Sequence, residues 1–351
     1  MFSNKAITGI EIGATTINTV GFKFNKNKFI AQFHEAVDLV GKYGLNSYYD
    51  VDEKVIIQAL SYLNEKYQLN KTHLRLAIPS DKSIFKIIDV KREQVEPDLT
   101  ESIRQQFAPP EKEQNEEVEI SCFELENAKN DSDTVSLLAC AVPIASVNYY
   151  KSLLQNADLH ISIMDLDVFA LYNAFYYMHY ESIKHPVTIV EVGSQYSISV
   201  MTMPGEHPFF KIINLGSDDI TKNMMQETGL NFSKAEKLKR RVLQTHWLGS
   251  ESYKKSKISE IYSEFVEKFL IEIKKCIRHY QATKGSKDAG EIFLTGSGAQ
   301  LPSLNQRIKE KLKIKSTVWN PMAAFWNKRE SAESLQAVQL TVALGTVLRG
   351  D

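Results

Sequence analysis

The chain has 351 residues, of which 43% are apolar and 24% charged, a balance that excludes a wholly disordered, collagen-like or coiled-coil protein. At roughly 100–200 residues per domain, this length predicts two or three domains. The 42 Lys and Arg residues against 43 Asp and Glu give a net charge of -1, so no overall field favours a nucleic-acid partner.

Cysteine usage and hydropathy indicate the cell compartment. Cys122, Cys140 and Cys276 form no CxxC pair, which is typical of a reducing compartment and argues against zinc. The longest apolar run, residues 136–147, falls short of the roughly 20 residues that a membrane span needs. No signal-peptide pattern opens the sequence. We therefore expect a cytoplasmic protein that does not itself insert into the membrane.

The N-terminal region predicts three strands and a helix. Residues 6–12, 17–24 and 28–33 have strand-like patterns, and the small polar corner Gly13-Ala14-Thr15-Thr16 separates the first two. Asp52 then begins a helix whose apolar residues recur at helical spacing as far as Leu63.

The next region alternates strands and helices within about 90 residues. The predicted strands are 74–78, 83–90 and 134–142, and the predicted helices are 98–107 and 144–157. The Glu-rich stretch 111–126 is interpreted as a solvated edge hairpin.

The opening pattern then recurs in the second half of the chain. After an apolar helix predicted over 165–180, Glu191-x-Gly193 repeats Glu11-x-Gly13 at an offset of 180 residues. The second copy also lies between strand patterns, with the corner Gly193-Ser194-Gln195-Tyr196. We interpret this repeat as two related domains.

The C-terminal half predicts mainly helices. They span residues 218–228, 233–245, 258–282 and 333–348, and Ser233-x-x-Glu236 is read as a capping box. Residues 234–257 are rich in Lys and Arg, which indicates either a solvated face or a wall facing an anion. A strand over 291–295 leads into Gly296-Ser297-Gly298.

Three small-residue corners therefore follow strands, and such corners allow backbone N–H groups to approach a phosphate closely. Neither GxGxxG nor GxxxxGK[ST] occurs, so the Rossmann and Walker phosphate sites are absent, and HExxH and GxSxG are absent too.

In this order, the motifs resemble one family over nearly the whole chain. They are Leu74-Arg-Leu-Ala-Ile-Pro79, Ala139-Cys-Ala-Val-Pro143 and residues 164–171, 213–221, 235–239, 294–304, 320–321 and 343–350. This layout is similar to the type IV pilus assembly protein PilM family, which belongs to the actin-like ATPase superfamily and is close to FtsA.

The resemblance implies an α/β, actin-like ATPase fold, with two duplicated α/β domains around a nucleotide cleft. Each domain is expected to hold a mainly five-stranded mixed sheet. Domain 1 would comprise residues 1–73, 163–185 and 333–351, with its terminal helix packing back on it. Residues 74–162 would form a small inserted α+β subdomain, and residues 186–332 would form domain 2.

The resemblance also implies ATP between the two domains. The first phosphate loop would be Gly13, Ala14, Thr15 and Thr16, and the second Gly193, Ser194, Gln195 and Tyr196. The adenosine would be bordered by Gly296, Ser297, Gly298 and Gly216, with Glu236 and Lys239 reaching the ribose and base.

Several residues depart from the family pattern. Glu11 and Glu191 replace the Asp residues that hold water-bound Mg²⁺, and Asp167, the candidate catalytic residue, replaces a Glu. Bulky Gln195 and Tyr196 replace small residues, and Asn18 stands where the family has a Lys. Since Mg²⁺ requires near-ideal octahedral geometry, the exchange predicts slow or absent ATP hydrolysis unless the shorter Asp167 compensates. Alternatively, Glu11 and Glu191 pair with Lys or Arg.

By resemblance, the function is that of a scaffold in a type IV pilus or related secretion platform, peripheral to the inner membrane through its partner. That partner would be the cytoplasmic N-terminal peptide of a PilN-like single-pass membrane protein, and self-association is a further expectation. The peptide would enter a groove of the inserted subdomain, with Phe85, Ile87, Ile103 and Phe107 as lining residues or, alternatively, as that subdomain's own core. Other classes left open are an active ATPase, an FtsA-like polymerising protein and a small-molecule kinase.

Overall fold

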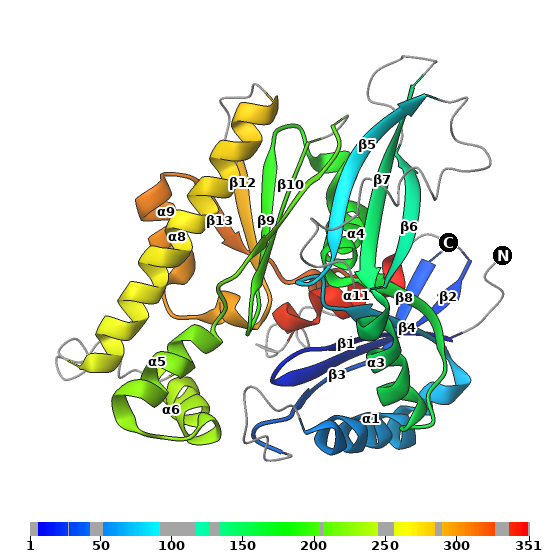
Figure 1. Ribbon diagram of the computed structural model, residues 1–351, viewed down its shortest axis with the longest axis horizontal. Helices are drawn as coiled ribbons and strands as arrows, with labels where there is room; N and C mark the ends of the chain where they lie inside the picture. The colour runs from blue at the N-terminus through cyan, green and yellow to red at the C-terminus, as the bar shows by residue number, and fades with distance from the viewer. Residues whose placement is uncertain are drawn as a thin grey trace.

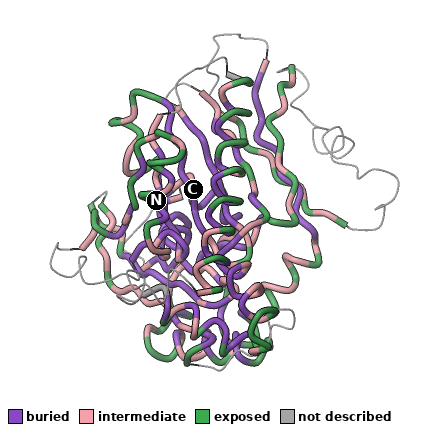
Figure 2. The backbone as a smooth tube through the Cα atoms, turned by 90° about the vertical axis from the view of Figure 1, so that its left-hand side faces the viewer, coloured by how far each residue is buried: buried purple, intermediate pink, exposed green. Residues whose placement is uncertain are grey.

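The computed structural model describes residues 6–26, 28–42, 52–91, 117–125, 134–203, 206–244, 256–284, 290–326 and 337–349. Within these residues the chain forms two five-stranded sheets and one three-stranded sheet, with helices packed around them (Figure 1). Buried segments run through the middle of the molecule and exposed ones lie outside (Figure 2).

The first five-stranded sheet has the strand order β3-β2-β1-β4-β8. Strands β1, β2 and β3 form an antiparallel meander, and β4 and β8 extend the sheet in parallel to β1. The bounds are β1 Ala6–Ile12, β2 Thr16–Asn25, β3 Lys28–Asp38, β4 His73–Ile78 and β8 Ile161–Leu166.

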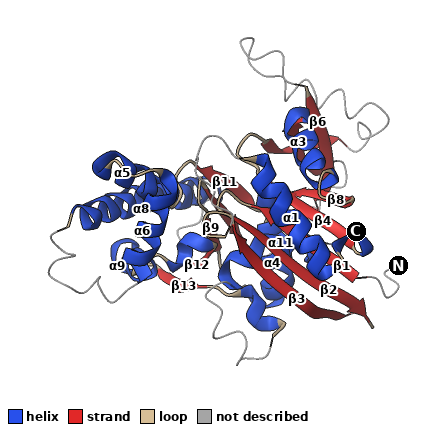
Figure 3. Cartoon of the chain, turned by 90° about the horizontal axis from the view of Figure 1, so that it is seen from below, coloured by secondary structure: helices blue, strands red, loops and turns tan. Residues whose placement is uncertain are grey.

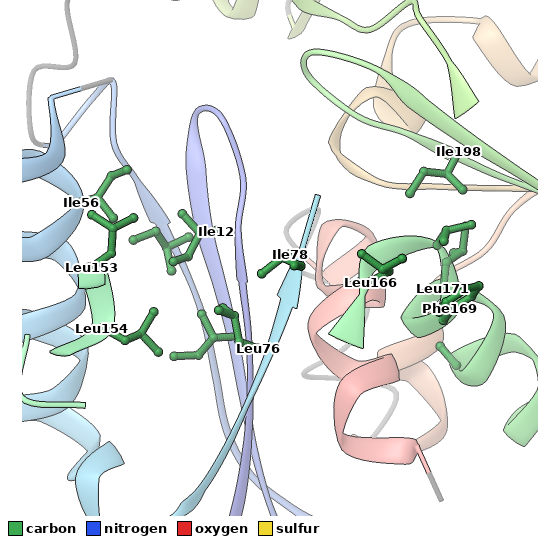
Figure 4. Packing of buried hydrophobic residues seen from close by; sticks show 14 of the residues in the cluster. Ile12, Ile56, Leu76, Ile78, Leu153, Leu154, Leu166, Phe169, Leu171 and Ile198 are labelled. Atoms are coloured by element: carbon green, nitrogen blue, oxygen red, sulfur yellow. The ribbon is translucent and has the colours of Figure 1, made fainter. Parts of the chain in front are cut away.

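Alternation along β1 directs its side chains to two different layers. Ile10 and Ile12 join the core under helices α1 (Glu53–Tyr67) and α3 (Ile144–Gln155), where Ile56, Leu153 and Leu154 pack (Figure 4). Ile7 faces α11 (Thr341–Leu348) on the opposite side.

Two glycines allow α11 to approach closely. A β-carbon at Gly9 would overlap the carbonyl oxygen of Ala343, and one at Gly345 would overlap that of Ala170 in α4 (Asp167–His179). Every residue of α11 is buried, as expected of a helix that is apolar all round. Helix α11 thus packs on the first sheet, where the terminal helix was expected. The preceding turn, η7 (Ala337–Leu340), is a 3₁₀ helix, and residues 333–336 of the predicted helix lie outside the described residues.

The second five-stranded sheet repeats the first. Its order is β11-β10-β9-β12-β13, again a meander followed by two parallel strands. Glu11 lies beside β2 and β4 in the first sheet as Glu191 lies beside β10 and β12 in the second. This duplication confirms the predicted fold class. The bounds are β9 Val187–Val192, β10 Ser197–Thr202, β11 Phe209–Ile213, β12 Glu291–Thr295 and β13 Lys315–Val318.

Helices α5 (Asp218–Thr228), α6 (Phe232–Gln244), α8 (Lys257–Lys284) and α9 (Leu304–Leu312) accompany the second sheet, while α4 and α11 lie between the two sheets (Figure 3). The capping box predicted at Ser233 is wrong. Asn231 is the N-cap of α6, because its side-chain oxygen accepts from the Lys234 N–H at 3.0 Å. Glu236 is therefore one turn inside the helix.

The third sheet, β5-β7-β6, is antiparallel and leaves the first sheet after β4. Its strands are β5 Ile84–Lys91, β6 Val118–Leu125 and β7 Thr134–Pro143. Strand β4 was expected to belong to this insertion, but it pairs with β1 and β8, so the departing segment begins after Ile78 rather than at residue 74. The predicted helix 98–107 and residues 111–116 and 126 of the acidic stretch lie outside the described residues, whereas residues 118–125 of that stretch form the outer strand β6.

Helix α4 begins two residues later than predicted, because Asp165 and Leu166 complete β8. It also joins the two halves of the molecule. Phe175 packs against Phe293 and Trp319, with ring centroids 5.1 and 5.2 Å away. One continuous apolar core therefore extends from under α1 to β9 and β10.

Candidate functional site

A cavity of about 160 Å³ lies where the two repeated corners meet. Its polar lining combines both corners with three acidic side chains, and no Lys, Arg or His is among the described lining residues. The predicted site residues that line it are Glu11, Gly13, Ala14, Thr16, Asp167, Glu191, Gly193, Ser194, Gln195, Tyr196 and Ser297.

The two corners are in direct contact with each other. Thr15 Oγ1 and Ser194 Oγ share a hydrogen bond of 3.2 Å, so Thr15 joins the corners without lining the cavity. The first corner is a tight turn in which the Gly13 N–H donates to the Thr16 carbonyl at 2.9 Å. The Leu39 N–H fixes it further by donating to the Thr15 carbonyl at 3.0 Å.

The second corner is held from behind by the start of α5. The N–H groups of Ser217 and Asp218 donate to the carbonyls of Gly193 and Ser194 at 2.9 and 2.8 Å. A β-carbon at Gly216 would overlap the Ser194 carbonyl. Gly216 therefore supports this corner rather than lining the cavity, and two amides at this helix start are occupied by the protein itself.

Three carboxyl groups face the cavity without a basic neighbour among its lining residues. Burial and nearby Asp167 raise the pKa of Glu11 to about 7, although a hydrogen bond from Asn18 lowers it. Burial also raises the pKa of Asp167 to about 6, and burial together with Glu11 and Asp167 raises that of Glu191 well above its usual range. Removal of water and mutual repulsion thus disfavour the charged forms of these groups, and the pKa is raised less for Asp167 than for Glu191.

Asp167 is the most completely bonded of the three. Its Oδ1 accepts from the N–H groups of Ser80 at 3.1 Å and Val168 at 2.7 Å, and also from the Ser80 hydroxyl. Its Oδ2 accepts from the hydroxyl of Tyr196, which comes from the other half of the molecule.

Glu11 is held by Asn18 on the neighbouring strand. Asn18 Nδ2 donates to Glu11 Oε2 and to the Gln339 carbonyl, both at 3.0 Å. Asn18 is one of the family departures, and in this chain its amide bonds the carboxyl group and the turn before α11 together.

Two glycines make room for Glu191. A β-carbon at Gly296 would overlap Glu191 Oε1, and one at Gly193 would lie 3.2 Å from its Oε2. Gly298 packs instead on Val192. Gly296 and Gly298 therefore lie behind the cavity, against β9, and do not line it.

Glu236 and Lys239 were expected to reach the ribose and base, but they pair with each other. Lys239 Nζ lies 2.6 Å from Glu236 Oε2 and 3.7 Å from Asp218 Oδ1, and all three side chains are buried. Arg240 contacts Glu236 and also Asp38 of β3, each at 2.8 Å. This ion-pair network is a second link between the halves, and neither Glu236 nor Lys239 lines the cavity.

The cavity does not fit a magnesium nucleotide in its present form. Small-molecule sites usually have about 300–1,000 Å³, and a triphosphate would meet three acidic groups here. Both oxygens of Asp167 already accept hydrogen bonds from the protein, and within the described residues no set of three His, Cys, Asp or Glu side chains is placed to hold a metal ion.

A second, larger cavity of about 970 Å³ forms a groove between the inserted sheet, α4 and the β10–β11 segment. Its walls are rich in aromatic side chains, and Asp165 and Arg349 form an ion pair of 3.3 Å in its lining. The aromatic lining residues are Phe123, Phe169, Tyr172, Phe175, Tyr176, Tyr177, Tyr180 and Phe210.

The residues predicted to line a partner groove are placed as follows. Phe85 is partly buried and packs edge to face on Phe169 and Phe210, which line the groove. Ile87 is 39% exposed and lies opposite Leu138, another lining residue. Ile103 and Phe107 lie outside the described residues.

Several site residues had no local sequence signal. Ser80, Tyr149, Tyr150 and Gln339 line or support the cavity, and Asp38 and Arg240 meet across 202 residues of sequence. The only sequence signal near them was Tyr196, a bulky residue where the family pattern has a small one.

None of the helices in the described part of the chain has both the length and the apolar character that a membrane span requires.

Comparison with solved structures supports the fold. A chain of the "PilM-PilN type IV pilus biogenesis complex" is 18% identical, with 98% of each chain covered and a TM-score of 0.78. The ethanolamine utilization protein EutJ of Carboxydothermus hydrogenoformans is 14% identical, covering 99% of this chain and 90% of that one, with a TM-score of 0.53. MreB5 of Spiroplasma citri bound to AMPPNP is 9% identical, covering 99% and 96%, with a TM-score of 0.53.

These similarities show an actin-like ATPase fold. No curated protein sequence matches the chain. The sequence profile of the family described as "Type IV pilus assembly protein PilM" matches residues 9–351, which is nearly the whole chain. The chain therefore belongs to the PilM family of type IV pilus assembly proteins.

Proposed function

We propose that this chain is a cytoplasmic scaffold of a type IV pilus assembly platform and that it binds the N-terminal cytoplasmic tail of a PilN-like single-pass membrane protein. The aromatic groove carries this proposal, because it is the larger of the two cavities described here and has the size of an ordinary ligand site. Family membership and the likeness to a chain of a PilM-PilN complex support the choice of partner.

The groove suits an extended apolar peptide. Phe123, Tyr177 and Tyr180 expose 39–50% of their surfaces, and aromatic side chains supply large, rigid contact areas. Strand β6, which contributes Phe123 and Leu125, is an outer strand of its sheet. A peptide beside it would gain main-chain pairing on one side and side-chain pockets on the other.

The test is a titration of the full chain with a fluorescent peptide of the PilN-like tail. We expect Phe123→Lys and Tyr180→Lys each to weaken binding at least tenfold, since each places a charge in the apolar wall. Ile271→Lys is the matched control, because Ile271 is 53% exposed on α8, outside the groove. Wild-type affinity in both groove variants, with unchanged circular dichroism, would rule out this groove as the tail site.

A second candidate function is nucleotide binding between the repeated corners. Two small-residue corners in duplicated positions favour it, and the similar MreB5 structure is described as bound to AMPPNP. Gly13, Ala14, Thr16, Gly193, Ser194 and Ser297 would then approach the ligand, but only after the cavity has widened. Titration of the purified chain with ATP, with and without Mg²⁺, tests this candidate, and ATP turnover can be followed in the same samples.

A further inference from the structure

We propose that Tyr196 is a latch that holds the two halves of the molecule closed over Glu11, Asp167 and Glu191 and keeps anionic ligands out of the corners. The inference rests on the proposed nucleotide site only for the identity of the excluded ligand. Closure itself is argued from contacts within this chain.

The latch spans the two repeats. Tyr196 is the last residue of the second corner, directly before β10, whereas Asp167 begins α4 directly after β8 of the first sheet. The phenol must be the donor, because an ionised Asp167 carries no proton to give. Burial and the neighbouring Asp167 raise the pKa of Tyr196 well above its usual range, so this donor persists at neutral pH.

The surroundings make Asp167 a fixed acceptor. Its other oxygen is held by the Ser80 and Val168 N–H groups and by the Ser80 hydroxyl. The carboxyl group cannot turn away without losing these bonds. The Tyr196 side chain, in contrast, projects from a corner, so it is the movable partner of the pair.

Other polar contacts cross the same boundary, and two of them lie near the corners or the ion-pair network. Thr15 bonds Ser194 at 3.2 Å, and Asp38 pairs with Arg240 at 2.8 Å. The Thr15–Ser194 bond joins two neutral hydroxyls, and the Asp38 and Arg240 side chains are 39% and 30% exposed, so solvent weakens their attraction. The Tyr196–Asp167 bond is charge-assisted and is more buried than the Asp38–Arg240 pair. Charge-assisted hydrogen bonds are about twice as strong as neutral ones.

The Tyr196 side chain both holds the two halves together and keeps anionic ligands out of the cavity. With the phenol in place, the cavity is about 160 Å³, and its described lining holds three acidic side chains and no Lys, Arg or His. Moving the phenol away would both widen the cavity and free one oxygen of Asp167. A triphosphate therefore competes with Tyr196 for the space between the corners.

Amide hydrogen exchange of the full-length chain tests the latch without any ligand. In Tyr196→Phe, which removes only the hydroxyl, we expect peptides containing the amides of Gly13 and Leu39 to exchange about tenfold faster or more. These amides lie in the first half and donate to carbonyls of that half, those of Thr16 and Thr15. Tyr280→Phe, at a buried tyrosine of α8 that lines neither cavity, is the control and should change neither peptide. Faster exchange confined to residues 193–198 would mean a local role only and would overturn the latch.

Titration with the fluorescent nucleotide mant-ATP tests exclusion. We expect Tyr196→Phe, and more so Tyr196→Ala, to bind at least tenfold more tightly than the wild type. If the wild type binds as tightly as both variants, the phenol is no barrier and exclusion is wrong. If no form binds while Gly13 and Leu39 exchange faster in Tyr196→Phe, the latch stands and the nucleotide proposal fails.

Discussion

The side chain of Glu191 packs directly against the backbone of Gly296. The Glu191 carboxyl oxygen Oε1 occupies the space where a β-carbon at Gly296 would project, and Gly296 has a φ of +83°. A longer acid than the family pattern is thus accommodated by the glycine of the third corner, on the neighbouring strand segment.

Gly296→Ala is therefore expected to be strongly destabilising. The new methyl group would collide with Glu191 and lie 2.8 Å from the Val192 carbonyl, in addition to the strain of a positive φ. Gly229→Ala is the matched control, because its φ is +67° and nothing lies within 4 Å, so it measures the backbone strain alone, about 1–2 kcal/mol. In urea unfolding, Gly296→Ala should lose several kcal/mol more unfolding free energy than Gly229→Ala. Equal losses in the two variants would mean that Glu191 is not packed against Gly296.

The buried acid Glu11 predicts a pH-dependent stability. Folded Glu11 keeps its proton up to about pH 7, while in the unfolded chain it ionises near 4.5, so the folded state binds more protons in this window. The free energy of unfolding should fall as pH rises through it, by at most about 3 kcal/mol from this group.

Glu11→Gln removes this contribution and still allows an oxygen to accept from Asn18. We expect the variant to gain stability relative to the wild type as pH rises from about 4.5 to 7, measured by chemical denaturation at each pH. Glu65→Gln, at an exposed position on α1, should run parallel to the wild type. A Glu11→Gln curve that also runs parallel would contradict the raised pKa.

Glu236→Gln tests whether the Glu236–Lys239 pair is structural. Burial opposes the charge of Glu236, but Lys239 and Arg240 lower its pKa overall. Losing that charge leaves a buried ammonium poorly compensated, and we expect a cost of about 3 kcal/mol in unfolding free energy. Glu272→Gln breaks an exposed pair with Lys275 and should cost less than about 0.5 kcal/mol. A small, equal effect at both sites would leave Glu236 available for a ligand.

Phe175→Ala tests the role of α4 as the joint between the sheets. Phe175 is fully buried against Phe293 and Trp319, so we expect a loss of about 3–5 kcal/mol. The next residue, Tyr176, is 40% exposed, and its alanine variant should lose about 1 kcal/mol or less. Thermal unfolding of the two variants gives the comparison, and similar losses would argue against a shared core.

The sequence was sufficient to predict the duplication, because each half repeats the same strand–corner–strand pattern around Glu11 and Glu191. It misplaced β4, since an apolar strand such as Leu74-Arg-Leu-Ala-Ile78 carries no mark of the sheet that it joins. The predicted start of helix α4, at Asp165, was two residues too early for a similar reason. Asp165 and Asp167 both resemble helix-start residues, and pairing with β4 decides between them.

The sequence predicted the backbone corners of the site well. It predicted less well which side chains pair with each other. Spacing places Glu236 and Lys239 on one helix face, but it cannot tell whether they face a ligand or each other. The Tyr196–Asp167 bond and the Asp38–Arg240 pair join segments that are far apart in the sequence, so only the folded chain brings them together. Whether the corners bind a nucleotide stays a prediction.

The packing of α11 on β1 has a consequence for synthesis on the ribosome. Ile7, Val20 and Phe22 in the first two strands are covered by Leu344 and Val347, which emerge more than 300 residues later. Strands β9–β13 span a continuous stretch, so the second sheet can assemble while the first is still uncovered. The nascent chain must therefore carry an exposed apolar surface through most of its translation, and that surface is where a chaperone would be needed.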